Sequence, residues 1–277
     1  MAPQATTMRP DGDARGDWLR FNVLGMGGPK PGISIVDAGT GFIQTMTEFP
    51  AGSSAYAVDR APDGSALIVG TKAGDVMRMD SLQHDGKDGF HANVMDVLPV
   101  PRSPILDVAF LGNRHVILAN QAGGCWLTPL GPDMGGPRAL NALREMTYAV
   151  QVLSDRAWAG LTASGSILIW ELSDPQHPCK VTGGPTPSRC GALVQLVAWE
   201  KRNALAYTCG EGELAVYLPD KDRFDVVSAH KGPAYAVFPA GECLVTIGRD
   251  DGMARIWSES LEPAAPPLSC PRGIVGG

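Results

Sequence analysis

The sequence has 277 residues and a formal net charge of −6, and 44% of its residues are hydrophobic against 19% charged. Such a composition supports a hydrophobic core and excludes a wholly disordered chain. The negative charge and the lack of any run of Lys and Arg argue against partners whose binding needs clustered positive charge. We therefore expect neither a nucleic acid nor a membrane as the partner.

The N-terminal segment 1–17 is polar and patternless. We expect it to be a disordered tail that precedes one domain over residues 18–277. The tail lacks the apolar stretch of a secretory signal peptide, and no apolar run in the chain reaches the ~18 residues of a membrane span. These features predict a cytoplasmic protein.

The six cysteines include no C-x-x-C pair. Cys209 and Cys243 lie in apolar, strand-like runs, where a reduced cysteine acts as a small hydrophobe. We therefore expect free thiols. A disulfide between Cys179 and Cys190, which both lie in a Pro-rich segment, is the alternative.

An internal repeat organises the chain. Six glycines each begin an alternating run, and successive glycines are separated by 42, 49, 42, 47 and 40 residues. They are Gly32, Gly74, Gly123, Gly165, Gly212 and Gly252. A period of this length is typical of blade-type β repeats.

Each repeat predicts four strands, because short apolar and β-branched runs alternate with Gly, Pro, Asn and Asp. First strands are expected within residues 55–64, 105–113, 147–155, 193–202 and 234–242. Second strands follow within residues 65–71, 115–121, 156–162, 203–209 and 243–248. The run after each glycine gives the third strand, and weaker runs at 42–49, 92–98, 142–146, 179–182 and 223–230 give the fourth. Small sheets of this kind cannot bury both faces alone, so neighbouring sheets must stack.

One segment leaves its secondary structure open. Residues 138–146 are rich in Ala, Leu, Arg, Glu and Met, and these residue types favour a short helix as much as the fourth strand.

In the last repeat, Gly252 permits a tight turn with a positive φ before the third strand. The alternation that follows places Met253, Arg255 and Trp257 on one face of a strand, and we expect Trp257 to be buried between neighbouring sheets.

The segment 228–257, SAHKGPAYAVFPAGECLVTIGRDDGMARIW, resembles a repeat of the WD40 β-propeller family. His230 falls on the His of the family's Gly-His turn, and Trp257 falls on its Trp, although Ser258 replaces the Asp that follows. The resemblance implies a His–Asp–Ser/Thr–Trp hydrogen-bond chain. The residues that would form it are His230, Thr246, Trp257 and either Asp250 or Asp251.

The other repeats depart further from the WD40 pattern. Trp170 matches the family's Trp but is followed by Glu171, and no other repeat has a matching His. The looser repeats are similar to those of bacterial propellers, and the Ala-, Gly- and Arg-rich composition is common in bacterial proteins. The resemblance covers residues 32–260 and implies a fold rather than a single function.

The expected fold is therefore all-β, a single propeller of six four-stranded blades. Residues 18–54 lack one strand of a complete repeat, and the tail 267–277, PLSCPRGIVGG, is the candidate to supply it. Pairing of the two termini would close the ring and protect its edge strands. The alternatives are a seven-bladed ring and an open ring completed by a partner chain.

The resemblance implies a protein–protein interaction scaffold that is not an enzyme. WD40 proteins commonly bind a partner on the face formed by the second-to-third-strand turns and by the loops that lead into the first strands. The turns here hold Lys72, Gln121, Ser164, Glu211 and Arg249, and the loops hold Ser53, Arg102, Glu145, Arg189 and Lys231. Of these we assign the partner-binding face to Lys72, Gln121, Glu145, Glu211, Lys231 and Arg249. Their mixed charge favours a protein or peptide, such as an associated enzyme, bound by a chain that is monomeric alone or one subunit of a complex.

No motif predicts a cofactor, a metal ion or a catalytic residue. His84 and His91 bracket a polar loop without the spacing of a calcium or zinc motif. His177, Cys179 and Cys190 offer three zinc ligands without a fourth. A metal-dependent, lactonase-like propeller hydrolase is the alternative function, but the repeat-equivalent turn positions are not consistently Asp, Glu or His.

Overall fold

The computed structural model describes residues 10–11, 18–23, 32–37, 43–46, 55–63, 65–80, 83–84, 90–91, 94–100, 102–130, 135–140, 146–183 and 195–269. The chain divides into two compact units, Met1–Asn141 and Ala142–Gly277. The described residues are strands and turns with one short 3-10 helix, η2 (Glu200–Arg202), so the predicted all-β class is confirmed. None of these residues lies in a helix of the length and apolarity that crossing a membrane requires.

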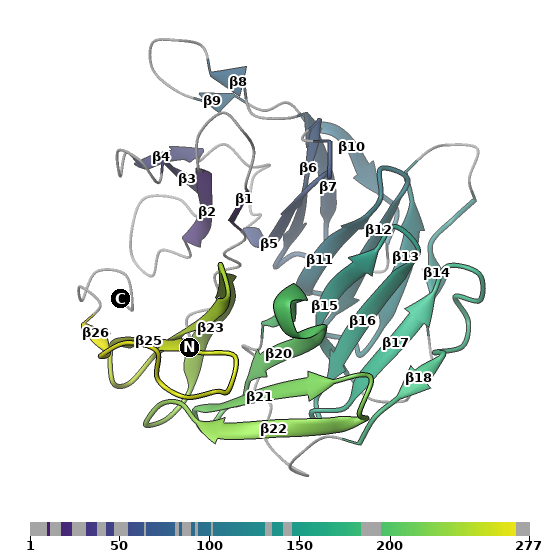
Figure 1. The fold of residues 1–277 in the computed structure, drawn as a ribbon. Helices are drawn as coiled ribbons and strands as arrows, with labels where there is room; N and C mark the ends of the chain where they lie inside the picture. Colours follow the sequence, from purple (N-terminus) through teal and green to yellow (C-terminus); the bar gives the residue numbers. More distant parts are fainter. Residues whose placement is uncertain are drawn as a thin grey trace. The chain divides into compact units, whose positions relative to one another are not determined.

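The first unit contains three four-stranded antiparallel sheets in its described part, together with a small two-stranded ladder (Figure 1). The first sheet has the order β1 (Pro10–Asp11), β2 (Trp18–Val23), β3 (Gly32–Asp37), β4 (Ile43–Met46). The second has the order β10 (Val94–Leu98), β7 (Val76–Asp80), β6 (Ala66–Thr71), β5 (Ala55–Arg60). The third has the order β11 (Ile105–Leu111), β12 (His115–Asn120), β13 (Cys125–Pro129), β14 (Arg138–Ala139), and the ladder pairs β8 (Gln83–His84) with β9 (Phe90–His91).

The second unit also contains three four-stranded antiparallel sheets among its described residues (Figure 1). They are β15 (Thr147–Ser154), β16 (Ala157–Thr162), β17 (Ile167–Glu171), β18 (Lys180–Val181); then β19 (Leu196–Trp199), β20 (Ala204–Thr208), β21 (Glu213–Leu218), β22 (Arg223–Ser228); and β23 (Ala234–Ala240), β24 (Cys243–Gly248), β25 (Met253–Trp257), β26 (Leu268–Ser269). The repeated four-stranded sheet predicted from the glycine spacing is therefore present, and it fits a β-propeller-like fold.

The glycines of the repeat act as predicted at the turns between second and third strands. Gly74, Gly123, Gly165 and Gly212 have φ values of 92°, 93°, 80° and 88°, a region that side chains other than glycine rarely adopt. In the Gly165 turn, the Gly165 N–H donates to the Thr162 carbonyl at 3.0 Å, and the Ser166 N–H donates to Thr162 Oγ1 at 3.2 Å. The local sequence therefore fixes both the turn and its hydrogen bonds.

The three sheets of the second unit pack face to face, as do the second and third sheets of the first unit. One core in the second unit joins Leu161 and Ile167 to Tyr207 and Tyr217 of the next sheet. A second core joins Trp199 and Val216 to Leu244 and Trp257, and Trp257 is 5% exposed. In the first unit, one core contains Ile68 and Val76 of the second sheet with Val108 and Leu118 of the third. The prediction that Trp257 is buried between two sheets is therefore confirmed.

The terminal sheets differ from the prediction. The strand that completes the first sheet is β1, whose Pro10 and Asp11 pair with Leu19 and Trp18, so this part of segment 1–17 is strand rather than tail. The tail strand β26 pairs with β25 in the last sheet. The expected blade with strands from both termini is therefore wrong for the described strands. The first sheet is completed by β1 from the N-terminal segment, and β26 from the C-terminal segment completes the last sheet. The rest of 1–17 and residues 270–277 lie outside the described residues.

The fourth strand of the third sheet also differs from the prediction. It is β14, where Arg138 and Ala139 pair with Leu127 and Trp126, and it precedes the run 142–146 that the apolar pattern favoured. The edge of β13 pairs with the first residues that return alongside it, whatever their hydrophobicity. Residues 141–145 of the alternative helix lie outside the described part of the chain.

Candidate functional site

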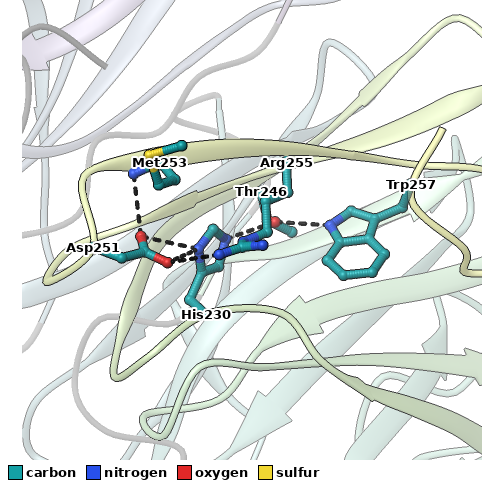
Figure 2. Close-up of polar contacts among 6 residues, drawn as sticks. All are labelled: His230, Thr246, Asp251, Met253, Arg255 and Trp257. Carbon is teal, nitrogen blue, oxygen red and sulfur yellow. Dashed lines mark hydrogen bonds and ion pairs between the residues drawn. The ribbon is translucent and has the colours of Figure 1, made fainter. Parts of the chain in front are cut away.

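A chain of polar side chains crosses the last sheet (Figure 2). Trp257 Nε1 donates to Thr246 Oγ1 at 2.8 Å, and Thr246 Oγ1 lies 2.8 Å from His230 Nε2. His230 Nδ1 lies 3.0 Å from Asp251 Oδ2. These are the residues that the WD40 resemblance assigned to a hydrogen-bond chain, and three sequence segments supply them.

The donors and acceptors fix the direction of the chain. A carboxylate can only accept, so His230 Nδ1 carries a hydrogen that it donates to Asp251. An indole N–H can only donate, so Trp257 uses one lone pair of Thr246 Oγ1. The Thr246 hydroxyl is then free to donate to the unprotonated Nε2 of a neutral His230. Every polar group of the chain is satisfied in this arrangement, as a buried network requires.

The geometry selects Asp251 rather than Asp250. Asp251 also accepts from the Met253 N–H at 3.1 Å and from Arg255 Nη2 at 3.2 Å, and Figure 2 shows these groups converging on its carboxylate. Asp250 instead accepts from Arg249 Nε at 2.7 Å. The turn is one residue longer than in the other repeats, and this extra residue carries the second carboxylate into the sheet.

Burial at His230 and hydrogen bonds at Asp251 decide the protonation of this cluster. Burial lowers the pKa of His230 below its ordinary 6.5, although the Asp251 carboxylate acts in the opposite direction. Burial alone would raise the pKa of Asp251, but the hydrogen bonds from His230, the Met253 N–H and Arg255 outweigh it and leave the pKa below 3.8. A neutral histidine beside an ionised carboxylate is therefore the state at neutral pH.

The order Thr246, His230, Asp251 is that of a nucleophile, a base and an orienting acid. Thr246 is 0% exposed, however, and its hydroxyl oxygen already accepts from Trp257. The His230 side chain is only 1% exposed. A substrate has no access to the hydroxyl, so the chain ties the sheet together rather than performing catalysis.

We call the end of each sheet where the second strand turns into the third strand the turn end. The predicted partner-binding residues that the structure describes in the second unit lie there. Glu211 and Lys231 are exposed, and the Arg249 side chain is 34% exposed. The loop that leads into β23 lies against the β20–β21 turn, because the His230 N–H donates to the Gly212 carbonyl at 2.8 Å. Glu211 and Lys231 are thus carried by one joined surface.

Arg249 belongs to the same surface. Its backbone N–H donates to the Pro233 carbonyl at 2.8 Å, which fixes the β24–β25 turn against the loop that leads into β23. A Cβ added at Gly232 would stand 2.5 Å from Asp250 Oδ2, so this loop and this turn are in close contact. The three described residues of the predicted face in this unit, Glu211, Lys231 and Arg249, therefore share one end of the last two sheets.

The first unit has the same arrangement. Lys72, Arg102 and Gln121 are exposed. The Gln121 N–H donates to the Pro104 carbonyl at 2.8 Å, and a Cβ at Gly74 would stand 2.5 Å from the Ser103 backbone nitrogen. Each turn is therefore held against the loop that leads into a first strand.

The other predicted residues are either buried or half-buried, or lie outside the described residues. Glu145, Ser53 and Arg189 lie outside the described residues, and Ser164 is half-buried with its hydroxyl 2.9 Å from that of Ser166. Trp170 is 1% exposed and stacks on Trp158 with ring centroids 6.1 Å apart. Its role is in the core.

Sequence reasoning missed one contact between two sheets of the second unit. Lys180 Nζ, on β18, donates to the Pro219 carbonyl at 2.7 Å and lies 5.5 Å from the centre of the Tyr217 ring. The Tyr217 hydroxyl donates to Asp222 at 2.7 Å. No local motif predicts this contact, because its partners are far apart in sequence.

The candidate metal ligands do not assemble in the described part of the chain, where no group of three or more His, Cys, Asp or Glu side chains is placed to hold an ion. His177 bonds to Asp174 at 3.2 Å, and Cys179 donates to the Ile169 carbonyl. Cys190 lies outside the described residues. Cys125, Cys179, Cys209 and Cys243 are free thiols.

The sequence matches no model of a known protein family, and no curated protein matches it significantly.

Proposed function

We propose that the chain is a WD40-like β-propeller of six blades that acts as a non-enzymatic scaffold in the cytoplasm and binds a protein or peptide partner at the turn end of its sheets. The observation that carries this proposal is the way each turn is held. Backbone hydrogen bonds fix the turns of Gln121 and Arg249 against the loops that lead into first strands. Rigid loops with exposed polar tips are a common means of recognition.

The six four-stranded sheets among the described residues support the proposal of six blades. In a stack of sheets that pack face to face, each of the two end sheets leaves one face exposed to water. Closure of the stack into a ring covers both faces, so we propose a closed ring. The ring closure that we propose needs no exchange of strands between the termini, because β1 and β26 each pair within their own sheet.

The chemistry of the tips favours a protein partner of mixed charge. Lys72 and Arg249 are basic, Glu211 is acidic and Gln121 is neutral, so the surface offers donors and acceptors without a single-sign field. Such a surface gives specificity through complementary charges rather than through non-specific attraction. A partner enzyme of the same assembly is the class that we propose.

A fourfold variant tests the proposal. Lys72, Gln121, Glu211 and Arg249 are all changed to Ala, and the tagged full chain is used to capture partners that mass spectrometry identifies. We expect specific capture to be lost, while the urea midpoint changes little, since surface substitutions each move stability by no more than about 0.5 kcal/mol.

A matched variant controls for the number and kind of changes. It replaces Arg156, Gln176, Lys221 and Glu259, which are exposed residues of the same four types, with Ala. Capture should survive in this control. If the fourfold turn-end variant retained its partners at the level of the control, the proposed face would be wrong.

A further inference from the structure

A group of cations lies at the end of the β11–β14 sheet opposite to the Gln121 turn, which we call the corner end. The turn Gly112–Arg114 joins β11 to β12, and the Leu130 N–H donates to the Arg114 carbonyl at 2.8 Å. This bond holds the start of the β13–β14 connection beside the turn. Arg114, His115 and Arg138 are therefore brought to one region from segments up to 24 residues apart in sequence.

The sheet register places two of these side chains on the same face. Ile117 pairs with Leu127, which pairs with Arg138, and directly paired residues share a face. His115 is two residues before Ile117 on β12, so it projects to that face too. The opposite face carries Val116 and Leu118, which pack in the core of the first unit.

The positive charge at this corner is not neutralised by the carboxylates that the structure describes. None of them forms an ion pair with these three residues, and both arginines are exposed. Burial lowers the pKa of His115, and repulsion from Arg138 and Arg114 lowers it further. The two connections contain a single acid, Asp133, which lies outside the described residues.

Open glycine backbone borders the same corner. Gly112 lies in the β11–β12 turn, and Gly135 and Gly136 lead into Arg138 and β14. Apart from the glycine itself and its chain neighbours, no heavy atom of the described residues lies within 4 Å of the position where a Cβ of Gly112, Gly135 or Gly136 would stand. A ligand can therefore approach the main chain closely beside the two guanidinium groups.

We propose that this corner binds an acidic peptide segment, with Arg114 and Arg138 each holding a carboxylate and His115 between them. A guanidinium group fits a carboxylate with two parallel hydrogen bonds. Arg138 is in register with Ile117, three residues beyond Arg114, and β12 and β14 are two strand spacings apart. The backbone positions of the two arginines are therefore about 14 Å apart, close to the length of four residues of an extended peptide.

A peptide suits the corner better than a nucleic acid does. A nucleic acid needs several phosphate contacts to overcome salt, whereas the corner offers two arginines on a chain of net charge −6. The corner site lies at the other end of the sheet from the turn-end face and does not depend on the function proposed for that face.

The test uses hexaglutamate as the acidic peptide and hexaglutamine as its neutral control, at low ionic strength. The pKa of His115 is followed by NMR in the full chain. Hexaglutamate should raise this pKa, because a bound carboxylate favours the imidazolium form, and hexaglutamine should not. An unchanged His115 pKa at millimolar hexaglutamate, or equal shifts with both peptides, would overturn the proposal.

Variants locate the binding. Arg114→Ala and Arg138→Ala should each weaken hexaglutamate binding about tenfold, the cost of one charge-assisted hydrogen-bonded contact. Arg156→Ala, which removes an exposed arginine from the β15–β16 turn, should leave binding unchanged. Equal loss in all three variants would show a general charge effect, and tighter binding of single-stranded oligothymidylate than of hexaglutamate would point to a nucleic acid; either result contradicts the proposal.

Discussion

Two sheets of the second unit place a tryptophan at the same position and hold it by different means. Trp170 pairs with Trp158 in the sheet β15–β18, and Trp257 pairs with Leu244 in the sheet β23–β26. Each indole reaches back toward the residue two positions further along the second strand. That residue is Gly160 in one sheet and Thr246 in the other.

In the first of these sheets the tryptophan is held by shape. A Cβ at Gly160 would stand 3.0 Å from Trp170 Cζ3, so any larger residue would crowd the ring. Trp170 Nε1 is buried without a hydrogen-bond partner among the described residues. Trp158 and Trp170 stack with an interplanar angle of 9°, and apolar contact replaces the missing hydrogen bond.

In the last sheet the tryptophan is held by a hydrogen bond. Thr246 occupies the place of the glycine, accepts from Trp257 Nε1 at 2.8 Å and continues the chain to His230. The difference teaches that a repeat position can keep its tryptophan while the residue that supports the indole changes. Gly160 supports it by leaving space for the ring, and Thr246 supports it with a hydroxyl group. The polar version also makes the sheet sensitive to pH.

The largest expected effect is the loss of either indole. Trp257→Ala and Trp170→Ala should each lower the free energy of unfolding by about 3–5 kcal/mol, because each removes a large buried side chain. Urea unfolding measures the loss. A change below about 1 kcal/mol for Trp257→Ala would contradict its burial between two sheets.

The second effect separates the two supports through the glycine. Gly160→Ala should lower stability by about 1–3 kcal/mol, because the new methyl group overpacks the space of the Trp170 ring. Gly183→Ala is the matched control in the same unit, since no heavy atom of the described residues, apart from its chain neighbours, lies within 4 Å of its added Cβ. Equal urea midpoints for these two variants would show that the ring does not need the glycine.

The third effect separates the supports through the indole N–H. Trp257→Phe should cost about 1–2 kcal/mol more than Trp170→Phe, because only Trp257 loses a buried hydrogen bond. Both changes remove a similar ring volume, so each is the control for the other. If Trp170→Phe proved as costly as Trp257→Phe, the polar chain would contribute nothing beyond packing.

The smallest effect is a pH dependence confined to the polar sheet. Because the pKa of folded His230 is below 6.5, the unfolded chain binds the proton first, and stability falls as the pH drops from about 6.5 through the folded pKa. The pKa of Asp251 is below 3.8, so its contribution is present at neutral pH and is lost in a second, more acidic window. The Trp158–Trp170 pair has no titratable group.

Urea unfolding at pH 7.5 and pH 5.5 measures the first window. His230→Asn should flatten the dependence, whereas His177→Asn, a change at an exposed histidine, should not. His115, whose pKa is also lowered, contributes with the same sign in the first unit. An unaltered slope in His230→Asn would show that the chain is not the source.

The sequence alone determined the first three strands of the complete repeats and the glycine turns that join their second and third strands. The glycine spacing predicted the third strands, and Gly74, Gly165 and Gly212 adopt the positive φ that the turns require. These features are local, because alternation and turn geometry depend on residues within a few positions of one another. The hydrogen-bond chain of His230, Thr246 and Trp257 came from resemblance to a known repeat, and its members lie within 28 residues.

Only the tertiary structure decided which groups meet. It chose Asp251 over Asp250, because the longer turn brings the second carboxylate to the imidazole. It placed the two-residue strands β14 and β26, whose pairing depends on a neighbouring edge rather than on their own pattern. It also brought Arg138 to the corner of Arg114 and His115, because sheet register sets the distance between their segments. Register across a long connection cannot be predicted from any local run of residues.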